Sequence, residues 1–534
     1  MKKINFYLMT AYLFSTITSS NLYALSPNNM LAVVEENAGH VNFYNPKDGK
    51  SLGELQIGYL PHEIALSPDG KTAYVSNFGI KDYDSGAGRP GTSISVIDIP
   101  SRTEKYRLYT FDPAEHKNFD QIDSAPHGIK LRPSSNNLLY VNIEKGNKVL
   151  VFNLDTNSII KKFDVSPNTH NMLFSADGKI LWLMAGRDGI FRIDPDTGKI
   201  TGNLTLTTPV RGLKFTPDQQ YLMASAYNQV VLVDPIKLSI VKQFDNLGVG
   251  QILYSDMTPD QKYIIAPAAF DNQVVIIDVQ TGKIVKRIVT GLNPVSVILS
   301  PSGKYAYVTN ATDNHITKIN LTTLSSKMIH THDGPNGTTF VPFQTKVTHK
   351  KLVLGTVLPL SGQDAQKGRD MMRGYEYWRL MIEQAGGLYI GNTSYDVKIV
   401  YLDSQSDSST ITNLTNELVD KYHATILLST YGLSSYNVMK NISLQKHIPL
   451  TPAQNNDSPW QPNEIAAGQD FFVTSKEYDQ QYYRQYNFKA SNYSASATAI
   501  GIVLQKALSD TKNFDYDTLT KAFEQNKFHV FYNF

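Results

Sequence analysis

Residues 64–77 read IALSPDGKTAYVSN, and residues 297–310 read VILSPSGKYAYVTN. Each stretch is a short apolar strand, a turn built on Pro, Asp or Gly, and a second apolar strand. Four stretches between them follow the same plan: IKLRPSSNNLLYVN from Ile129, MLFSADGKILWLMA from Met172, LKFTPDQQYLMASA from Leu213 and DMTPDQKYIIAPAA from Asp256. The N-terminal part of the chain is therefore built on an internal repeat.

The repeat has a period that identifies its architecture. The residue before the Pro or Ala of each turn serves as a marker, and the markers are Ser67, Arg132, Ser175, Thr216, Thr258 and Ser300. From Arg132 onward they follow one another at intervals of 41 to 43 residues. A third strand and a fourth strand complete each copy, and the third strands count to seven. Four short strands in a repeat of this length are typical of a blade of a β-propeller.

The two ends of the repeat region are expected to close the ring. The chain enters at Asn29 with a second-strand pattern, and the missing first strand reappears as NGTTFVPF from Asn336. Pairing these segments removes a sheet edge that would otherwise invite aggregation. The sequence therefore predicts an all-β, seven-bladed propeller over residues 28–345.

Two motifs carry a resemblance to a known class. Residues 307–310 read YVTN, residues 74–77 read YVSN, and SPDGK fills the turn from Ser67. The chain resembles the YVTN class of bacterial extracytoplasmic propellers over residues 28–345. That resemblance implies the fold, while such propellers serve as binding platforms, as lactonase-like enzymes and as parts of redox systems.

One set of equivalent positions carries candidate functional residues. The residue five before each marker begins an innermost strand and should line the mouth of the central channel. These positions hold His62, His127, His170, Arg211, Leu253 and Val295, with Asn336 at the ring closure. Three imidazoles and a guanidinium on one arc suit a metal ion or an anion. The alternative is that each histidine forms a structural hydrogen bond to the neighbouring blade.

The mouth offers little evidence for catalysis. None of the seven positions holds a carboxylate, and Glu63 should alternate to the face of its strand opposite His62. A metal-dependent lactonase would need two or more carboxylates near the channel. We therefore predict no catalytic residue, no cofactor and no enzymatic activity, with a lactonase-like or metal-dependent propeller hydrolase as the alternative.

Residues 350–534 have a different sequence pattern. Apolar strands such as LVLGTVLPL from Leu352 and YDVKIVYLD from Tyr395 alternate with helical stretches near residues 368–384, 409–422 and 434–445. This alternation predicts an α/β unit with a parallel sheet. Ligands of such sheets bind beyond the carboxyl ends of the strands.

This second part resembles the branched-chain amino-acid type of periplasmic binding protein, the soluble receptor of ABC importers. The resemblance is carried by LPLSG from Leu358, RGY from Arg373, DSQSD from Asp403 and YG from Tyr431. By position it implies that an amino-acid ligand is bound by Gly432, Ser434, Ser435, Ala453 and Asn455. Ser434 at a helix start equally suits a helix cap. Most of a second lobe is missing, so the expected periplasmic-binding-protein domain is incomplete.

The N-terminus and the composition limit the cellular location and the binding partners that can be expected. Residues 1–24 have two lysines, a short apolar run and a small residue, Ala24, in the order of a cleaved signal peptide; an uncleaved anchor is the alternative. The absence of cysteine excludes disulfides and thiolate metal sites. A net charge of +2 gives no bulk reason to bind nucleic acid.

These features predict an extracytoplasmic, periplasmic or secreted binding protein without a membrane span in the mature chain. It would resemble the substrate-binding component of an amino-acid ABC transporter fused to a propeller. An amino acid or a carboxylate is the expected solute, and a permease or a periplasmic protein is the expected partner. The alternative to this function is an interaction scaffold with no role in small-molecule transport.

Overall fold

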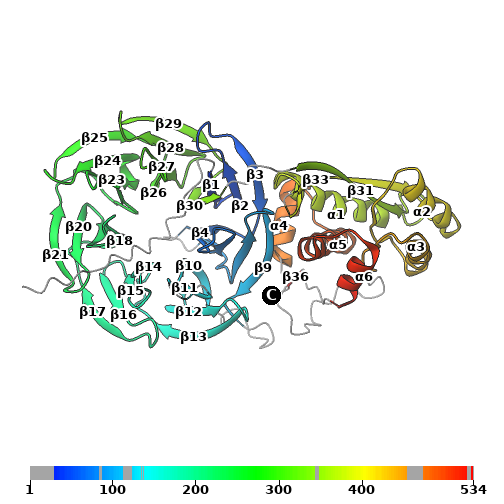
Figure 1. Ribbon diagram of the computed structural model, residues 1–534, viewed down its shortest axis with the longest axis horizontal. Helices are drawn as coiled ribbons and strands as arrows, with labels where there is room; N and C mark the ends of the chain where they lie inside the picture. The colour runs from blue at the N-terminus through cyan, green and yellow to red at the C-terminus, as the bar shows by residue number, and fades with distance from the viewer. Residues whose placement is uncertain are drawn as a thin grey trace, which may run out of the picture.

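The computed structural model describes residues 29–82, 87–111, 123–133, 135, 137–342, 348–391, 393–453, 473–525 and 531–532. A ring of β-sheets lies beside a smaller unit of helices and strands (Figure 1). The predicted signal peptide and the predicted ligand residue Asn455 lie outside the described residues. Among the helices that are described, none is long and apolar enough to cross a membrane.

Seven four-stranded antiparallel sheets form the ring, which confirms the seven-bladed propeller predicted from the repeat. From the axis outward, blades 1 to 4 are β30 (Pro335–Pro342), β1 (Asn29–Glu35), β2 (His40–Tyr44) and β3 (Ser51–Gln56); β4 (Pro61–Leu66), β5 (Thr72–Asn77), β8 (Ser93–Asp98) and β9 (Thr103–Tyr109); β10 (Ser124–Leu131), β11 (Leu138–Lys145), β12 (Lys148–Asn153) and β13 (Ser158–Asp164); and β14 (Asn171–Phe174), β15 (Leu181–Met184), β16 (Ile190–Ile193) and β17 (Ile200–Leu204).

The remaining blades keep the same order. Blades 5 to 7 are β18 (Val210–Phe215), β19 (Leu222–Ala226), β20 (Gln229–Asp234) and β21 (Ser239–Phe244); β22 (Asp256–Met257), β23 (Tyr263–Ala268), β24 (Gln273–Asp278) and β25 (Ile284–Val289); and β26 (Pro294–Leu299), β27 (Tyr305–Asn310), β28 (His315–Asn320) and β29 (Ser325–His330). A two-stranded hairpin of β6 (Ile80–Asp82) and β7 (Ala87–Gly88) extends blade 2, and the 3-10 turn η3 (Ala269–Asp271) follows β23.

The turn between the first and second strand explains why the motif recurs. Ser67 Oγ donates to Asp69 Oδ1 at 2.7 Å, and the same carboxylate accepts the backbone N–H of Lys71 at 3.0 Å. Gly70 follows with φ of +71°, which glycine adopts without strain. Thr216 with Asp218 and Thr258 with Asp260 repeat the hydroxyl-to-carboxylate bond at 2.6 Å. Each turn therefore reverses the chain by its own local hydrogen bonds.

The two ends of the repeat region pair as predicted. Strand β30 runs antiparallel to β1, with Met30 opposite Val341 and Leu31 opposite Phe340. Blade 1 therefore takes its innermost strand from the end of the repeat region and its other three from the beginning. The apolar side chains between blades are buried, and Val341 has no exposed surface.

The second unit contains a small mixed sheet surrounded by helices. Its elements are β31 (Thr348–Leu358), α1 (Ala365–Gln384), β32 (Leu388–Ile390), β33 (Thr393–Asp403), η4 (Ser408–Thr410), α2 (Ile411–Asp420), β34 (Ile426–Leu427), α3 (Leu433–Lys446), β35 (Val473–Thr474), α4 (Ser475–Tyr486), α5 (Asn492–Thr511), α6 (Tyr516–Gln525) and β36 (Phe531–Tyr532). The sheet order is β32-β33-β31-β34, with β31 parallel to β33 and β34 and with β32 antiparallel to β33. The predicted alternation of strands and helices is present.

A periplasmic-binding-protein fold is not confirmed for this unit. The described sheet has only four strands, and one of them is antiparallel. The late helices α4 and α5 do not build a second wall, because Tyr482 and Leu504 pack into the same core as Trp378 of α1. The burial of that apolar surface against α1 leaves a single compact unit.

The second unit packs against the outer strands of blades 1 and 2, as Figure 1 shows for α4 beside β3 and β9. Tyr377 of α1 donates its hydroxyl proton to Gln56 Oε1 at 2.9 Å, and Gln481 Nε2 of α4 donates to the carbonyl of Ile57 at 2.9 Å. The Arg102 guanidinium lies 5.2 Å from the centre of the Tyr389 ring. Polar contacts and a cation–π contact thus tie the two units together.

Candidate functional site: the propeller mouth

The three predicted mouth histidines lie in contact. His62 is in β4, His127 is in β10, and His170 directly precedes β14, so consecutive blades supply them. The ring centres of His62 and His127 are 4.2 Å apart, and those of His127 and His170 are 3.9 Å apart. The rings of Phe78 and His127 are nearly perpendicular, with their centres 5.0 Å apart. The innermost strands therefore bring three mutually tilted imidazoles into contact at one end of the channel.

Two glutamates that the sequence analysis did not single out complete this cluster. Glu36 Oε2 lies 3.2 Å from His62 Nδ1, and Glu144 Oε1 lies 2.7 Å from His170 Nδ1. Asn336, a predicted mouth position, donates to Glu36 at 2.9 Å. We call His62, His127, His170, Glu36 and Glu144 the mouth cluster.

The glutamates could have been found from the repeat itself. Each glutamate precedes its histidine by 26 residues, because it lies near the end of the second strand of one blade and meets the start of the first strand of the next. In blade 2 the position equivalent to the glutamates holds Phe78. It directly follows Asn77, the residue of β5 that pairs with Pro61 of β4. A comparison of the residues at the ends of the second strands with the histidines of the following blades would have identified both glutamates.

Glu63, which the sequence places on the face of its strand opposite His62, makes contacts across the channel. Its Oε1 accepts a hydrogen bond from Asn171 Nδ2 at 3.1 Å, and Asn171 also donates to Tyr254 Oη at 3.1 Å. Blades 2, 4 and 6 supply these residues, so the contacts cross the channel. The pairing of β4 with β5 shifts register between Pro61 and Ile64. Glu63 thus supplies a third carboxylate near the channel.

The neighbouring charges set the protonation of these groups. Burial by itself would lower the pKa of His62, but the charges of Glu36, Glu63 and Glu144 and the hydrogen bond to Glu36 raise it overall. Burial, together with the adjacent His170 and His62, lowers the pKa of His127 well below its usual value. Hence His127 is neutral at pH 7, while His62 binds a proton more readily than a free histidine.

Arg211 and the remaining mouth positions complete the ring. Arg211 lies in β18 and Val295 in β26, while Leu253 precedes β22. Burial raises the pKa of Tyr254 well above its ordinary value, although the hydrogen bond from Asn171 and the charge of Arg211 act to lower it. The charged and imidazole side chains therefore occupy blades 1 to 5, and apolar ones face them from blades 6 and 7.

The arrangement supports two kinds of ligand. His127, His170 and Glu144 offer one ligand atom each within 4.8 Å of one another, which suits a divalent metal ion. Glu36, Glu63 and Glu144 together also favour an organic cation. An anion, one of the predicted ligands, is less compatible with this mouth, because three carboxylates surround the imidazoles.

The structure describes four of the five residues that the resemblance implies for amino-acid binding in the second unit. Helix α3 begins at Leu433, and Gly432, with φ of +87°, is its N-cap residue. Ser434 is therefore not the cap, and its side chain is exposed, as is Ala453. Ser435 is half-buried in the first turn of the helix.

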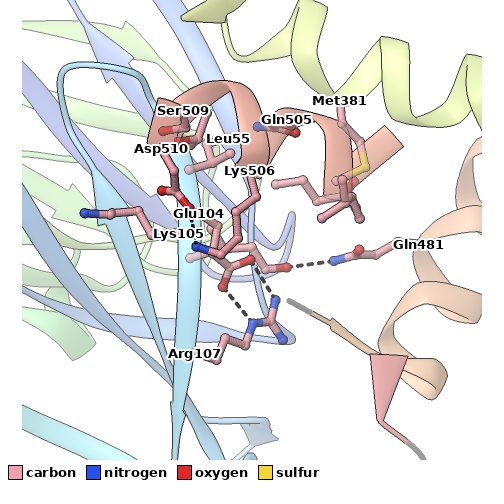
Figure 2. A pocket seen from close by; sticks show the side chains of 14 residues that line it. Leu55, Glu104, Lys105, Arg107, Met381, Gln481, Gln505, Lys506, Ser509 and Asp510 are labelled. Carbon is pink, nitrogen blue, oxygen red and sulfur yellow. Dashed lines mark hydrogen bonds and ion pairs between the residues drawn. The ribbon is translucent and has the colours of Figure 1, made fainter. Parts of the chain in front are cut away.

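One cavity lies between the propeller and the second unit (Figure 2). Leu55, Glu104 and Arg107 line it from the propeller, and Met381 and Lys506 from the second unit. Glu104 and Arg107 pair at 2.7 Å along its wall. With a volume of about 40 Å³ it has room for little more than one water molecule. We therefore regard it as a packing gap of the interface.

A larger depression of about 490 Å³ lies at the mouth end of blades 4 and 5. It is lined by Arg187, Leu206, Thr207, Thr208, Pro209 and Tyr227. Arg187 and Tyr227 lie in turns between second and third strands, and Pro209 precedes the strand of Arg211. These connections lie at the same end of the blades as the mouth cluster. The depression has the size of a small-molecule site.

Comparisons with known proteins match parts of the chain. A family model described as a choice-of-anchor I domain matches residues 21–138. Antigen Lp49 of Leptospira interrogans is 26% identical over 186 residues, which cover 32% of this chain and 36% of the relative. The chain thus spans about a third of the length of this curated relative.

Solved structures are similar to the propeller region at low sequence identity. A putative 6-phosphogluconolactonase from Bacteroides uniformis is 17% identical, with a TM-score of 0.47, over 59% of this chain and 99% of that protein. Hydrazine synthase of Kuenenia stuttgartiensis is 20% identical, with a TM-score of 0.43, over 60% of this chain and 99% of that protein.

Proposed function

We propose that this chain is an extracytoplasmic binding protein whose propeller mouth takes a small solute with an ammonium or guanidinium group. The binding role, without turnover, is the function that the side chains of the mouth support best. The extracytoplasmic location rests on the signal-peptide pattern of residues 1–24.

The observation that carries the proposal is the pair of fixed carboxylates beside the three contacting imidazoles. Glu36 and Glu144 are each held by a histidine, so neither has to be ordered when a ligand arrives. Such preorganisation lowers the entropic cost of binding. Glu63, across from Asn171, adds a third carboxylate, and the positive groups beside the three carboxylates are Arg211 and the His62 ring, whose raised pKa favours its charged form. A cationic group is attracted to this arc, and an anionic group is repelled.

The surroundings accommodate the rest of such a solute. The 490 Å³ depression is lined by Pro209, two residues before Arg211 in the chain, and by Arg187 and Tyr227. Tyr227 packs edge to face against Phe270 at 6.3 Å, and both rings are exposed. A zwitterionic solute would therefore find carboxylates on one arc of the mouth, and guanidinium and aromatic groups on the next.

Isothermal titration of the full chain in EDTA-containing buffer tests the proposal. Lysine and arginine should bind, whereas leucine and acetate should bind at least tenfold more weakly. Glu144→Gln and Glu36→Gln remove the charge at constant volume and should each weaken binding about tenfold, equivalent to about 1.4 kcal/mol. Glu417→Gln, at a half-buried position of α2 in the second unit, serves as the control and should bind as the unmodified chain does.

The same titration separates the mouth from the amino-acid site implied by resemblance in the second unit. Leucine binding that is abolished by Ser434→Ala and unaffected by Glu144→Gln would support the second unit instead. Absence of binding by every cation would contradict the proposal. Hydrolysis of a lactone that disappears in Glu144→Gln would favour the alternative of a lactonase-like enzyme.

A further inference from the structure

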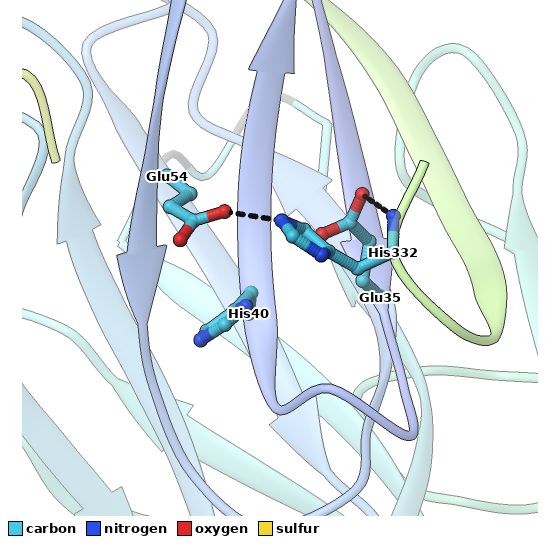
Figure 3. Close-up of side chains that lie close together, drawn as sticks. All are labelled: Glu35, His40, Glu54 and His332. Carbon is cyan, nitrogen blue, oxygen red and sulfur yellow. Dashed lines mark hydrogen bonds and ion pairs between the residues drawn. The ribbon is translucent and has the colours of Figure 1, made fainter. Parts of the chain in front are cut away.

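A second group of histidines and glutamates lies where the ring closes (Figure 3). Glu35 ends β1, His40 begins β2, and Glu54 lies in β3. His332 lies in the segment that leads from β29 to the closing strand β30. We call these four residues the closure cluster. It therefore connects three strands from the start of the propeller with the segment that delivers its last strand.

The side chains converge on one point. Each residue offers one ligand atom, and these atoms all lie within 4.8 Å of one another. Figure 3 shows the carboxylates of Glu54 and Glu35 on either side of the His332 ring, with His40 below them. His332 Nε2 lies 2.7 Å from Glu54 Oε2, and the rings of His40 and His332 are 5.7 Å apart. Their backbones come from different strands, so the fold itself brings them together.

Two buried atoms in the cluster have unused bonding capacity. Glu35 has no exposed surface; its Oε1 accepts the Tyr44 hydroxyl at 2.5 Å and the His332 backbone N–H at 3.1 Å. Its Oε2 and the Nδ1 of His40 are buried and have no hydrogen-bond partner within the described part of the chain. A buried polar atom without a partner is costly. A cation among the four side chains would satisfy both atoms at once.

The protonation states of the four ligands differ: the hydrogen bond to Glu54 raises the pKa of His332, so a metal ion would have to displace the proton of that ring. Burial lowers the pKa of His40 to about 4, so the ring is the neutral imidazole that a metal requires. Burial works against ionisation of Glu54, yet the hydrogen bond from His332 and the nearby histidine charges lower its pKa overall. Burial raises the pKa of Glu35, which a metal ion would counteract directly.

Neighbouring groups hold the carboxylates in place. Tyr44 Oη donates to Glu35, and Asn42 Nδ2 donates to Tyr44 Oη at 3.0 Å and to Glu54 Oε2 at 3.5 Å. Outer hydrogen bonds of this kind orient metal ligands and tune their basicity. The cluster therefore has ligands of two types and a supporting layer behind them.

We propose that the closure cluster binds one divalent transition-metal ion through Glu35, His40, Glu54 and His332, and that the ion fastens the closing strand to blade 1. Two imidazoles and two carboxylates suit zinc in four-coordinate geometry, and manganese or iron less closely. An ion that binds only the closed ring stabilises the closed ring. The proposal is independent of solute binding at the mouth.

Metal analysis of the full chain tests the proposal. The protein is stripped with EDTA, incubated with zinc, freed of excess zinc by gel filtration and measured by elemental analysis and thermal melting. We expect one zinc ion per chain and a zinc-dependent rise in Tm of about 2–5 °C. Glu54→Gln and His332→Ala should lose both effects. The side chain of His332 is 53% exposed, so its removal should leave the fold intact.

Two matched controls separate this site from other histidine–carboxylate pairs. His315→Ala removes a histidine that pairs with Asp313 at 3.0 Å in blade 7, and His170→Ala removes one from the mouth cluster. Both should retain the zinc ion and the Tm rise. Cobalt in place of zinc should give visible absorption typical of four-coordinate nitrogen and oxygen ligands, and this signal should vanish in His332→Ala. The proposal is overturned if zinc is not retained, or if His170→Ala loses it while His332→Ala keeps it.

Discussion

A single carboxylate joins two loops of the second unit. Asp403, at the end of β33, accepts the backbone N–H groups of Leu360 and Ser361 at 2.9 and 3.1 Å. Its other oxygen accepts the Ser361 hydroxyl at 2.6 Å. The two loops that resemble ligand loops of a binding protein are thus bonded to each other. Burial would raise the pKa of Asp403, but these hydrogen bonds and that from Gln405 lower it.

Asp403→Asn should therefore destabilise the second unit in a pH-dependent way. Because the pKa is lowered on folding, the stabilisation is present above the unfolded pKa near 3.9 and is lost as the pH falls through the folded value. We expect a loss of about 1–2 kcal/mol at pH 7 and a much smaller difference near pH 3. Urea unfolding at the two pH values measures it, with Asp420→Asn on the exposed surface as the control. An equal loss at both values would assign the effect to shape rather than charge.

At the scale of elements, two glycines allow α1 and α5 to lie in direct contact. A Cβ atom at Gly501 would lie 2.3 Å from the Trp378 ring, and one at Gly374 would lie 2.1 Å from the Ser494 carbonyl oxygen. The hydroxyl of Thr498 donates to the carbonyl of Gly374 at 2.9 Å across this contact. The close approach places Trp378 and Leu504 in one core. It explains why α5 packs on α1 instead of contributing to a second lobe.

Gly501→Ala tests this contact by the sign of its effect. In an unconstrained helix the change from glycine to alanine stabilises by up to about 1 kcal/mol. Here the added methyl group overlaps the indole ring, so we expect destabilisation of about 1–3 kcal/mol. Chemical unfolding followed by tryptophan fluorescence gives the difference. A more stable Gly501→Ala variant would show that the helices separate at little cost.

At the scale of the whole molecule, closure of the ring makes the propeller one cooperative structure. Strand β30 pairs with β1 and also packs against β4 of blade 2 and β26 of blade 7. Each blade buries its faces against its two neighbours, so no blade is stable alone. The second unit adds contacts on blades 1 and 2, the part of the ring beside the closure.

Val341→Ala in the closing strand should therefore lower the stability of the entire propeller. The side chain is fully buried, and losing two methyl groups with partial filling of the cavity should cost about 2 kcal/mol. Val285→Ala on β25, where the side chain is 44% exposed, is the matched control and should change stability by less than about 0.5 kcal/mol. Circular dichroism during urea unfolding measures both. A transition that separates blade 1 from the rest in Val341→Ala would contradict a single cooperative ring.

The sequence by itself determined the number of blades and their closure. The reason is that each turn, such as Ser67 with Asp69, forms from local hydrogen bonds, and the repeat shows the same pattern every 41 to 43 residues. It also placed the three histidines, because equivalent positions of a repeat lie at equivalent heights in a ring. The order of strands and helices in the second unit was predicted from periodicity in the same way.

Only the tertiary structure decided which side chains meet. Glu36 and Glu144 reach their histidines from the neighbouring blade, and Glu63 contacts Asn171 across the channel. The contact between Glu35 and His332 spans 297 residues and exists only because the ring closes. Local patterns specify elements, whereas contacts between distant elements depend on how those elements pack. The physical chemistry of both clusters is therefore a property of the closed ring.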